Sequence, residues 1–111
     1  MSAKRQYALG VYEKALPNEL SIAQKLEAAK IAGYDFMELS IDETDEKLAR
    51  LDWTPLQRKQ IKDSIHDIDM PIETMCLSGH RKYPLGSNDP AIVARSLEIM
   101  EKAIALAADL G

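Results

Sequence analysis

Three short runs rich in apolar residues stand out along the chain, at positions 7–12, 36–41 and 72–77. The first run has no long polar alternation, which is typical of a strand buried on both faces of a sheet. In the second run the two polar residues, Glu38 and Ser40, lie two positions apart and therefore share one face. The pattern predicts three strands, separated by longer segments with a different spacing.

In the segments between and after these strands, apolar residues recur at intervals of three and four, as on one stripe of a helix. We expect a helix after each strand and a further short helical turn at 47–51. The residues expected to start or stop the helices are Ser21 and Gly33, then Thr54, Pro55 and Pro71, then Ser87 or Asp89. The expected buried positions are Ile22, Leu26, Ala29 and Ala32, then Leu56, Ile61, Ile65 and Ile68, then Ile92, Val93, Leu97, Met100, Ile104 and Leu110.

Strands that alternate with helices indicate a parallel sheet, because each parallel crossover needs about a dozen residues and a right-handed connection. Three strands alone leave two open edges, so we expect further strands beyond Gly111. The first connection has no glycine-rich phosphate turn, which favours a barrel over an open dinucleotide-binding sheet. The predicted fold is α/β: residues 1–111 form a single, incomplete domain, the first three βα units of a TIM (β/α)₈ barrel.

Composition narrows the class of protein. A hydrophobic fraction of 46% and a charged fraction of 29% are ordinary for a soluble globular protein and exclude disordered and collagen-like chains. No apolar run approaches the roughly 20 residues that cross a bilayer, so we expect no membrane partner. The net charge of -4 is spread along the chain, which argues against nucleic acid as a partner. Cys76 is the only cysteine, so no disulfide forms within one chain, and a reducing cytoplasm is the expected location.

The chemically useful side chains are expected where the strands end, because that edge carries the active site in both parent folds. Glu13 and its neighbour Lys14 follow the first strand, where they could position a hydroxylated substrate, form an internal ion pair or be plain surface. Glu38 and Ser40 point inward from the second strand. A buried carboxylate must be paired, so these two fit either a structural network or a substrate contact.

Ser78, His80 and Arg81 follow the third strand and form the other candidate group. Of these, His80 and Arg81 could, with the neighbouring Lys82, hold a phosphate or hydroxyls through charge-assisted hydrogen bonds, or serve the structure alone. The acidic run 42–46 could bind a cation, although such a run is more often a solvated face or a helix N-terminus. We expect Cys76 to be a small buried apolar side chain rather than a nucleophile.

Four motifs in order along the chain carry a family resemblance: LGVYEKALP at 9–17, ELSIDETD at 38–45, RLDW at 50–53 and MCLSGHR at 75–81. Together they resemble the start of an L-ribulose-5-phosphate 3-epimerase, also described as an L-xylulose-5-phosphate 3-epimerase or hexulose-6-phosphate isomerase, of the xylose-isomerase-like TIM barrels. The resemblance extends over nearly all of residues 1–111, which correspond to well under half of the length of a typical member of the family.

The resemblance implies inversion at C3 of a ketopentose 5-phosphate, between L-ribulose 5-phosphate and L-xylulose 5-phosphate, in pentose and ascorbate breakdown. It also implies a divalent metal ion and two catalytic glutamates, all supplied beyond Gly111, so that residues 1–111 alone are inactive and contain no metal ligand. The expected substrate contacts are Glu13, Glu38, Ser40, Ser78, His80 and Arg81.

Other functions stay open at this point. One is another metal-dependent barrel enzyme, acting on unphosphorylated sugars or as an endonuclease-type phosphodiesterase. Another is a non-catalytic interaction module that completes its sheet by oligomerisation. A homo-oligomer is also compatible with the epimerase.

Overall fold

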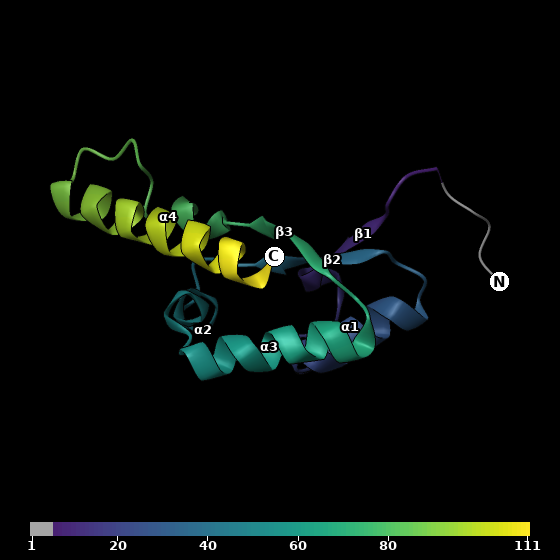
Figure 1. The fold of residues 1–111 in the computed structure, drawn as a ribbon. Coiled ribbons are helices and arrows are strands. Elements are labelled where there is room, and N and C mark those ends of the chain that lie inside the picture. The colour runs from purple at the N-terminus through teal and green to yellow at the C-terminus, as the bar shows by residue number, and fades with distance from the viewer. Residues whose placement is uncertain (1–5) are drawn as a thin grey trace.

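The structure, a computed structural model, describes residues 6–111 and alternates strands with helices (Figure 1). The strands are β1 (Gly10–Tyr12), β2 (Phe36–Ser40) and β3 (Ile72–Cys76). The α-helices are α1 (Ile22–Ile31), α2 (Asp45–Leu48), α3 (Pro55–Ile68) and α4 (Pro90–Leu110), and the 3₁₀ helices are η1 (Glu13–Ala15), η2 (Ala49–Asp52) and η3 (Ser78–Arg81). The short helical turn expected at 47–51 corresponds to α2 and η2.

The strands form one sheet in the order β1-β2-β3, and both neighbouring pairs run parallel, as the sequence predicts. The first strand is shorter than expected, because it begins at Gly10 and the preceding Tyr7 and Leu9 are exposed. Figure 1 shows α1 and α3 lying side by side along the sheet, with α4 next to β3.

One residue of β3 is extra to the pairing with β2. Met37 pairs with Ile72, but the next residue of β2, Glu38, pairs with Thr74. Glu73 is therefore a β-bulge, a feature that is rare between parallel strands. Because of the bulge, Thr74 and Glu38 lie on the same face of the sheet.

The helix starts follow from local hydrogen bonds. Ser21 and Thr54 each accept a hydrogen bond from the backbone three residues on, and a glutamine side chain accepts one from the cap's own N–H, which completes a capping box. Of the two expected caps for α4, Asp89 is the one used. No helix within residues 6–111 is both long and apolar enough to span a membrane.

Pro71 does not end α3, contrary to expectation. The helix ends at Ile68, and Asp69 follows it in the left-handed conformation, with φ of 58°. The N–H of Asp69 donates to the carbonyl of His66, and that of Met70 to Ile65. These bonds satisfy carbonyls that the last turn would otherwise leave open.

The core lies between β2 and the helices, where Met37 and Leu39 are fully buried. The expected stripe of α4 is wrong at Leu97 and Ile104, which are exposed, whereas Leu110 packs against the core as expected. The fully buried face of the helix is formed by Ser96, Ile99, Ala103 and Leu106. The helix carries apolar residues on two faces, so spacing alone does not select between them. Leu56 of α3 is likewise exposed, whereas Ile61, Ile65 and Ile68 pack against the core.

Asp69 provides a test of the left-handed helix end. The side chain of Asp69 is 92% exposed and its ion pair with Lys30, at 3.4 Å, contributes little. We expect Asp69→Gly to raise the free energy of unfolding by about 0.5–1 kcal/mol, because glycine adopts positive φ without strain. Urea unfolding would measure the change. Asp69→Ala is the control, since it removes the same carboxylate without relieving the backbone, and an equal gain from both variants would contradict this explanation.

Candidate functional site

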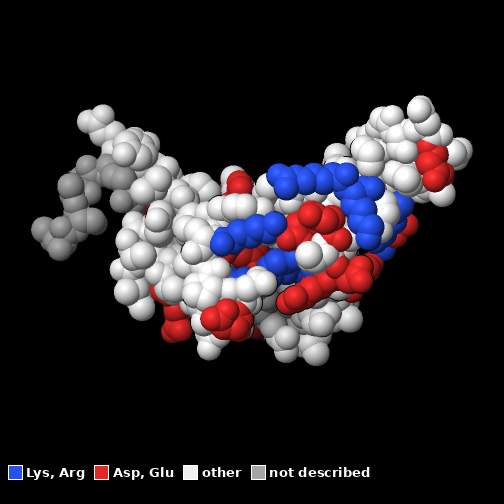
Figure 2. Space-filling model, turned by 180° about the vertical axis from the view of Figure 1, so that it is seen from behind, with Lys and Arg blue, Asp and Glu red and all other residues white. Residues whose placement is uncertain are grey.

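The three strands run parallel, so their last residues lie at the same end of the sheet, which we call its carboxyl edge. These residues are Tyr12, Ser40 and Cys76. The segments that follow them, η1, the α2 region and η3, therefore surround the same edge. Figure 2 shows basic and acidic side chains interleaved in one patch on this molecule rather than separated by sign. This edge is the candidate site.

Glu13, directly after β1, lies at the centre of a buried ion cluster. Its side chain is fully buried, and its carboxylate accepts hydrogen bonds from Lys25 at 2.7 Å, Lys47 at 3.1 Å and both terminal nitrogens of Arg50 at 2.5 and 2.7 Å. The three cations are themselves almost wholly buried. The expectation that Glu13 is plain surface is therefore wrong, and its partners are not its neighbour Lys14 but residues from α1, α2 and η2.

The same cluster holds the backbone at the end of β2. Glu13 Oε1 accepts a hydrogen bond from the N–H of Ser40 at 2.9 Å, and Arg50 donates to the carbonyl of Ser40 at 3.0 Å. The guanidinium group of Arg50 also lies 5.8 Å from the ring centre of Trp53. Both peptide groups of Ser40 are thus held by charged side chains, which fixes the direction of its hydroxyl.

These contacts set the ionisation of the cluster. Burial alone would raise the pKa of Glu13, but hydrogen bonds from Arg50, Lys25 and the Ser40 N–H hold it well below its usual range. Burial lowers the pKa of Lys47, and the charges of Arg50 and Lys25 act in the same direction. Glu13 is therefore ionised at neutral pH.

Lys14 is exposed and pairs with Asp42 at 2.8 Å. Asp42 also accepts hydrogen bonds from the N–H and hydroxyl of Thr44, at 2.9 and 2.6 Å, and Thr44 caps α2. Burial opposes ionisation of Asp42, but Lys14 and Thr44 lower its pKa to about 2. The acidic run begins with the buried Asp42, which pairs with the exposed Lys14, and continues, through Asp45 and Glu46, as the first turn of a helix. The helix-terminus interpretation of this run is the one the structure supports.

A second group of polar side chains lies on the face of the sheet opposite the core. Thr74 donates to the carboxylate of Glu38 at 2.8 Å, and the hydroxyls of Tyr12 and Ser40 are 3.1 Å apart. This face borders an open cleft of about 260 Å³. Cys76 helps to raise the pKa of Tyr12 and is only half-buried, so it is not the enclosed apolar side chain we expected.

The residues after β3 are divided between structural and exposed positions. His80 Nε2 donates to the carbonyl of Ser96 at 3.2 Å, which ties η3 to α4 and places the proton on this nitrogen. The hydroxyl oxygen of Ser78 is shielded from solvent and has no hydrogen-bond partner. Arg81 is exposed at the end of η3. His80 is thus engaged in holding η3 against α4 and the hydroxyl of Ser78 is shielded, whereas Arg81 is open to solvent.

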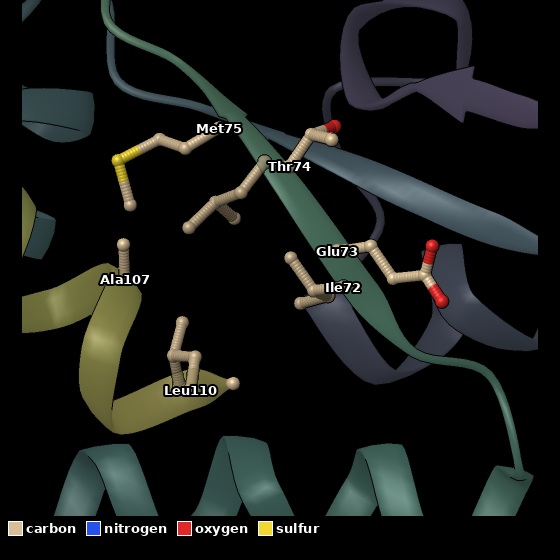
Figure 3. A pocket seen from close by; sticks show the side chains of 8 residues that line it. Ile72, Glu73, Thr74, Met75, Ala107 and Leu110 are labelled. Atoms are coloured by element: carbon tan, nitrogen blue, oxygen red, sulfur yellow. The ribbon is translucent and has the colours of Figure 1, made fainter.

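Two further cavities add little to the site. A gap of about 50 Å³ separates β3 from the end of α4, and Figure 3 shows Met75, Ala107 and Leu110 around it while the carboxylate of Glu73 points away. A polar cleft of about 420 Å³ lies between Lys14 and Lys47, with Asp42 and Glu46 balancing their charge. Within residues 6–111, no group of three or more His, Cys, Asp and Glu side chains could hold a metal ion.

Sequence reasoning missed Tyr12, Lys25 and Arg50. Tyr12 shares the face predicted for Glu38 and Ser40, so the period-two rule applied across neighbouring strands would have found it. Lys25 falls between Ile22 and Ala29 on the buried stripe of α1, a charge where the pattern requires an apolar residue. A lysine in that position indicates a buried carboxylate partner.

The ion cluster predicts a large effect of removing one charge. Glu13→Gln leaves three buried cations without a counter-charge, so we expect a loss of about 3 kcal/mol in the free energy of unfolding. Chemical denaturation followed by circular dichroism would measure it. The control is Glu19→Gln, the same change at an exposed residue, which should stay within about 0.5 kcal/mol. A similar small effect at both positions would contradict the importance of the cluster.

The cluster also predicts acid sensitivity. Glu13 and Asp42 have lower pKa values when folded than when unfolded, so their stabilisation is complete above their ordinary pKa values and is lost as pH falls through the folded ones. We expect the urea midpoint to decline between about pH 4 and about pH 2. Asp42→Asn should flatten part of this decline, and an unchanged slope would be evidence against the Lys14–Asp42 contribution.

Comparison with known proteins agrees with this arrangement. Residues 26–111 match the family described as "Xylose isomerase-like TIM barrel". Over 107 residues, 96% of the chain, the sequence is 50% identical to the L-ribulose-5-phosphate 3-epimerase UlaE of Escherichia coli, and 50% identical to the protein of the same name from Shigella boydii. The chain spans 38% of the length of each of these relatives. The parallel strands, the order of the elements and this match together show that the chain belongs to the xylose isomerase-like TIM barrel family.

Proposed function

We propose that the whole protein is an isomerase that inverts C3 of a ketopentose 5-phosphate, interconverting L-ribulose 5-phosphate and L-xylulose 5-phosphate in cytoplasmic pentose and ascorbate breakdown. The observation that carries the proposal is the 50% identity to proteins named as 3-epimerases, which extends over nearly the whole chain. The polar side chains gathered at the carboxyl edge of the sheet support it, because active sites of barrel enzymes lie at that edge.

The chemistry requires acid–base groups on both sides of the substrate. The proton on C3 is acidic because the neighbouring C2 carbonyl accepts the negative charge as an enediolate, and inversion requires removal on one face and return on the other. A divalent metal ion is expected to stabilise this charge in the whole protein. Within residues 6–111, no group of three or more His, Cys, Asp and Glu side chains could hold such an ion, and we propose that its ligands lie in the rest of the protein. The family resemblance implies the same placement for both catalytic carboxylates.

The role proposed for this part of the chain is to shape and bind. Glu38 lines the open cleft and is the strongest candidate for contact with sugar hydroxyls. Ser40 is fully buried, and its hydroxyl contributes through its contact with the hydroxyl of Tyr12. Arg81 is exposed after β3 and is available for the phosphate. Glu13 contributes by holding Ser40, since its own carboxylate is fully engaged by cations. His80 and Ser78 contribute through the packing of η3 rather than by facing the cleft.

The proposal is tested by proton exchange at a single carbon atom. In deuterated water, the whole protein with a divalent metal should incorporate deuterium at C3 of L-ribulose 5-phosphate and produce L-xylulose 5-phosphate, both visible by NMR. A chelator should abolish both signals and added metal should restore them. Residues 1–111 alone should give neither. Retention of the C3 proton by the metal-loaded whole protein would refute the function, and exchange by residues 1–111 alone would refute the placement of the catalytic carboxylates.

A further inference from the structure

Tyr12 is an aromatic residue on the polar face of the sheet, at the carboxyl end of β1. It is the last residue of β1, next to the fully buried Glu13, and it is half-buried itself. Its hydroxyl lies 3.1 Å from that of Ser40, the last residue of β2, and Cys76 of β3 is close enough to help raise the pKa of Tyr12. The side chain of Tyr12 therefore connects the ends of β1 and β2, beside the end of β3.

The two hydroxyls of this contact retain unused hydrogen-bonding capacity. Each hydroxyl offers one donor and two acceptor positions, and a single bond between Tyr12 and Ser40 uses one donor and one acceptor. Burial is the main cause that raises the pKa of Tyr12 above its ordinary value, so the phenol keeps its proton at neutral pH. Because Ser40 is fully buried, the capacity that is open to the cleft is that of the Tyr12 hydroxyl.

The surroundings restrict what such a pair would bind. Tyr12 lines the open cleft of about 260 Å³ together with Glu38 and Thr74. The hydrogen bond from Thr74 occupies one carboxylate oxygen of Glu38 and leaves the other available to a ligand. The ring of Phe36 supplies an apolar floor; a side chain at Gly10 would lie 2.3 Å from that ring. Hydroxyls and a carboxylate above an apolar surface suit a chain of carbons that each carry a hydroxyl group.

The backbone behind the pair is rigid. Ser40 is held through both of its peptide groups by Glu13 and Arg50, and Tyr12 is joined directly to Glu13. The hydroxyls are therefore preorganised, and binding a ligand through them orders little additional structure.

We infer that Tyr12 is a substrate-binding residue whose hydroxyl, oriented by Ser40, binds a hydroxyl group of a polyhydroxylated sugar phosphate. The inference rests on the proposed function for the identity of the sugar. Tyr12, and the contact by which Ser40 positions its hydroxyl, were not among the site features expected from the sequence.

The test compares Tyr12→Phe with Tyr7→Phe in the whole protein. Both variants remove one phenolic oxygen, but Tyr7 is 68% exposed and precedes β1. With L-ribulose 5-phosphate, Tyr12→Phe should raise KM about tenfold and leave kcat within about twofold. This pattern is expected because the lost hydrogen bond is made equally in the ground state and in the transition state. Ser40→Ala should raise KM less, and Tyr7→Phe should change neither constant. Circular dichroism would show that each variant keeps the fold.

A second measurement makes the inference independent of turnover. In ¹³C-tyrosine-labelled whole protein, the resonance of Tyr12 is assigned as the one lost in Tyr12→Phe, and that of Tyr7 as the one lost in Tyr7→Phe. L-ribulose 5-phosphate should shift the resonance of Tyr12 and leave that of Tyr7 in place. If the protein lacks epimerase activity but the shift appears, the proposed function fails and the inference stands. An unmoved Tyr12 resonance, or an unchanged KM in an active Tyr12→Phe variant, would overturn the inference.

Discussion

The carboxylate of Glu13 is the constraint on which the candidate site depends. A charge without solvent contact is tolerated only when its hydrogen-bonding positions are filled, and here Lys25, Lys47, Arg50 and the N–H of Ser40 fill them. These partners come from α1, α2, η2 and β2. A single anion thus determines how four elements meet at one edge of the sheet, with a directional precision that apolar packing does not provide. Because desolvation of the ions offsets much of their attraction, the cluster is better understood as setting geometry than as adding net stability.

The two faces of the sheet differ in polarity. On the helix side, Met37 and Leu39 are fully buried and join the apolar core. On the other side, polar side chains of neighbouring strands bond to one another, Tyr12 to Ser40 and Thr74 to Glu38. The first face accounts for folding, and the second leaves polar groups open to a ligand. In a closed barrel the second face is the interior, which is where a substrate pocket would be enclosed.

Local features of the fold are predictable from the sequence, and long-range ones are not. Residue type and position alone place Ser21 and Thr54 at helix starts, and the structure confirms both, because a capping bond involves a backbone N–H only three residues on. The shared face of Glu38 and Ser40 follows from strand alternation. By contrast, the burial of Glu13 depends on Lys25 and Arg50, which are 12 and 37 residues distant in sequence. The core face of α4 was missed because two apolar stripes satisfy the same period, and only the position of the sheet selects between them.

The extra residue in β3 also has a consequence for how this segment can vary in length. Side chains after Glu73 face the opposite way from those of an unbulged strand, so Met75 joins the core and Cys76 lies near the hydroxyl of Tyr12. Deleting Glu73 would leave Thr74 opposite Glu38 and Met75 opposite Leu39, so the two strands would pair regularly and both sulfur-containing side chains would keep their faces. The bulge therefore gives this strand one residue more than regular pairing requires. Loss of a second residue, Thr74, would place the thioether of Met75 opposite Glu38 among the polar groups and turn the thiol toward the apolar interior.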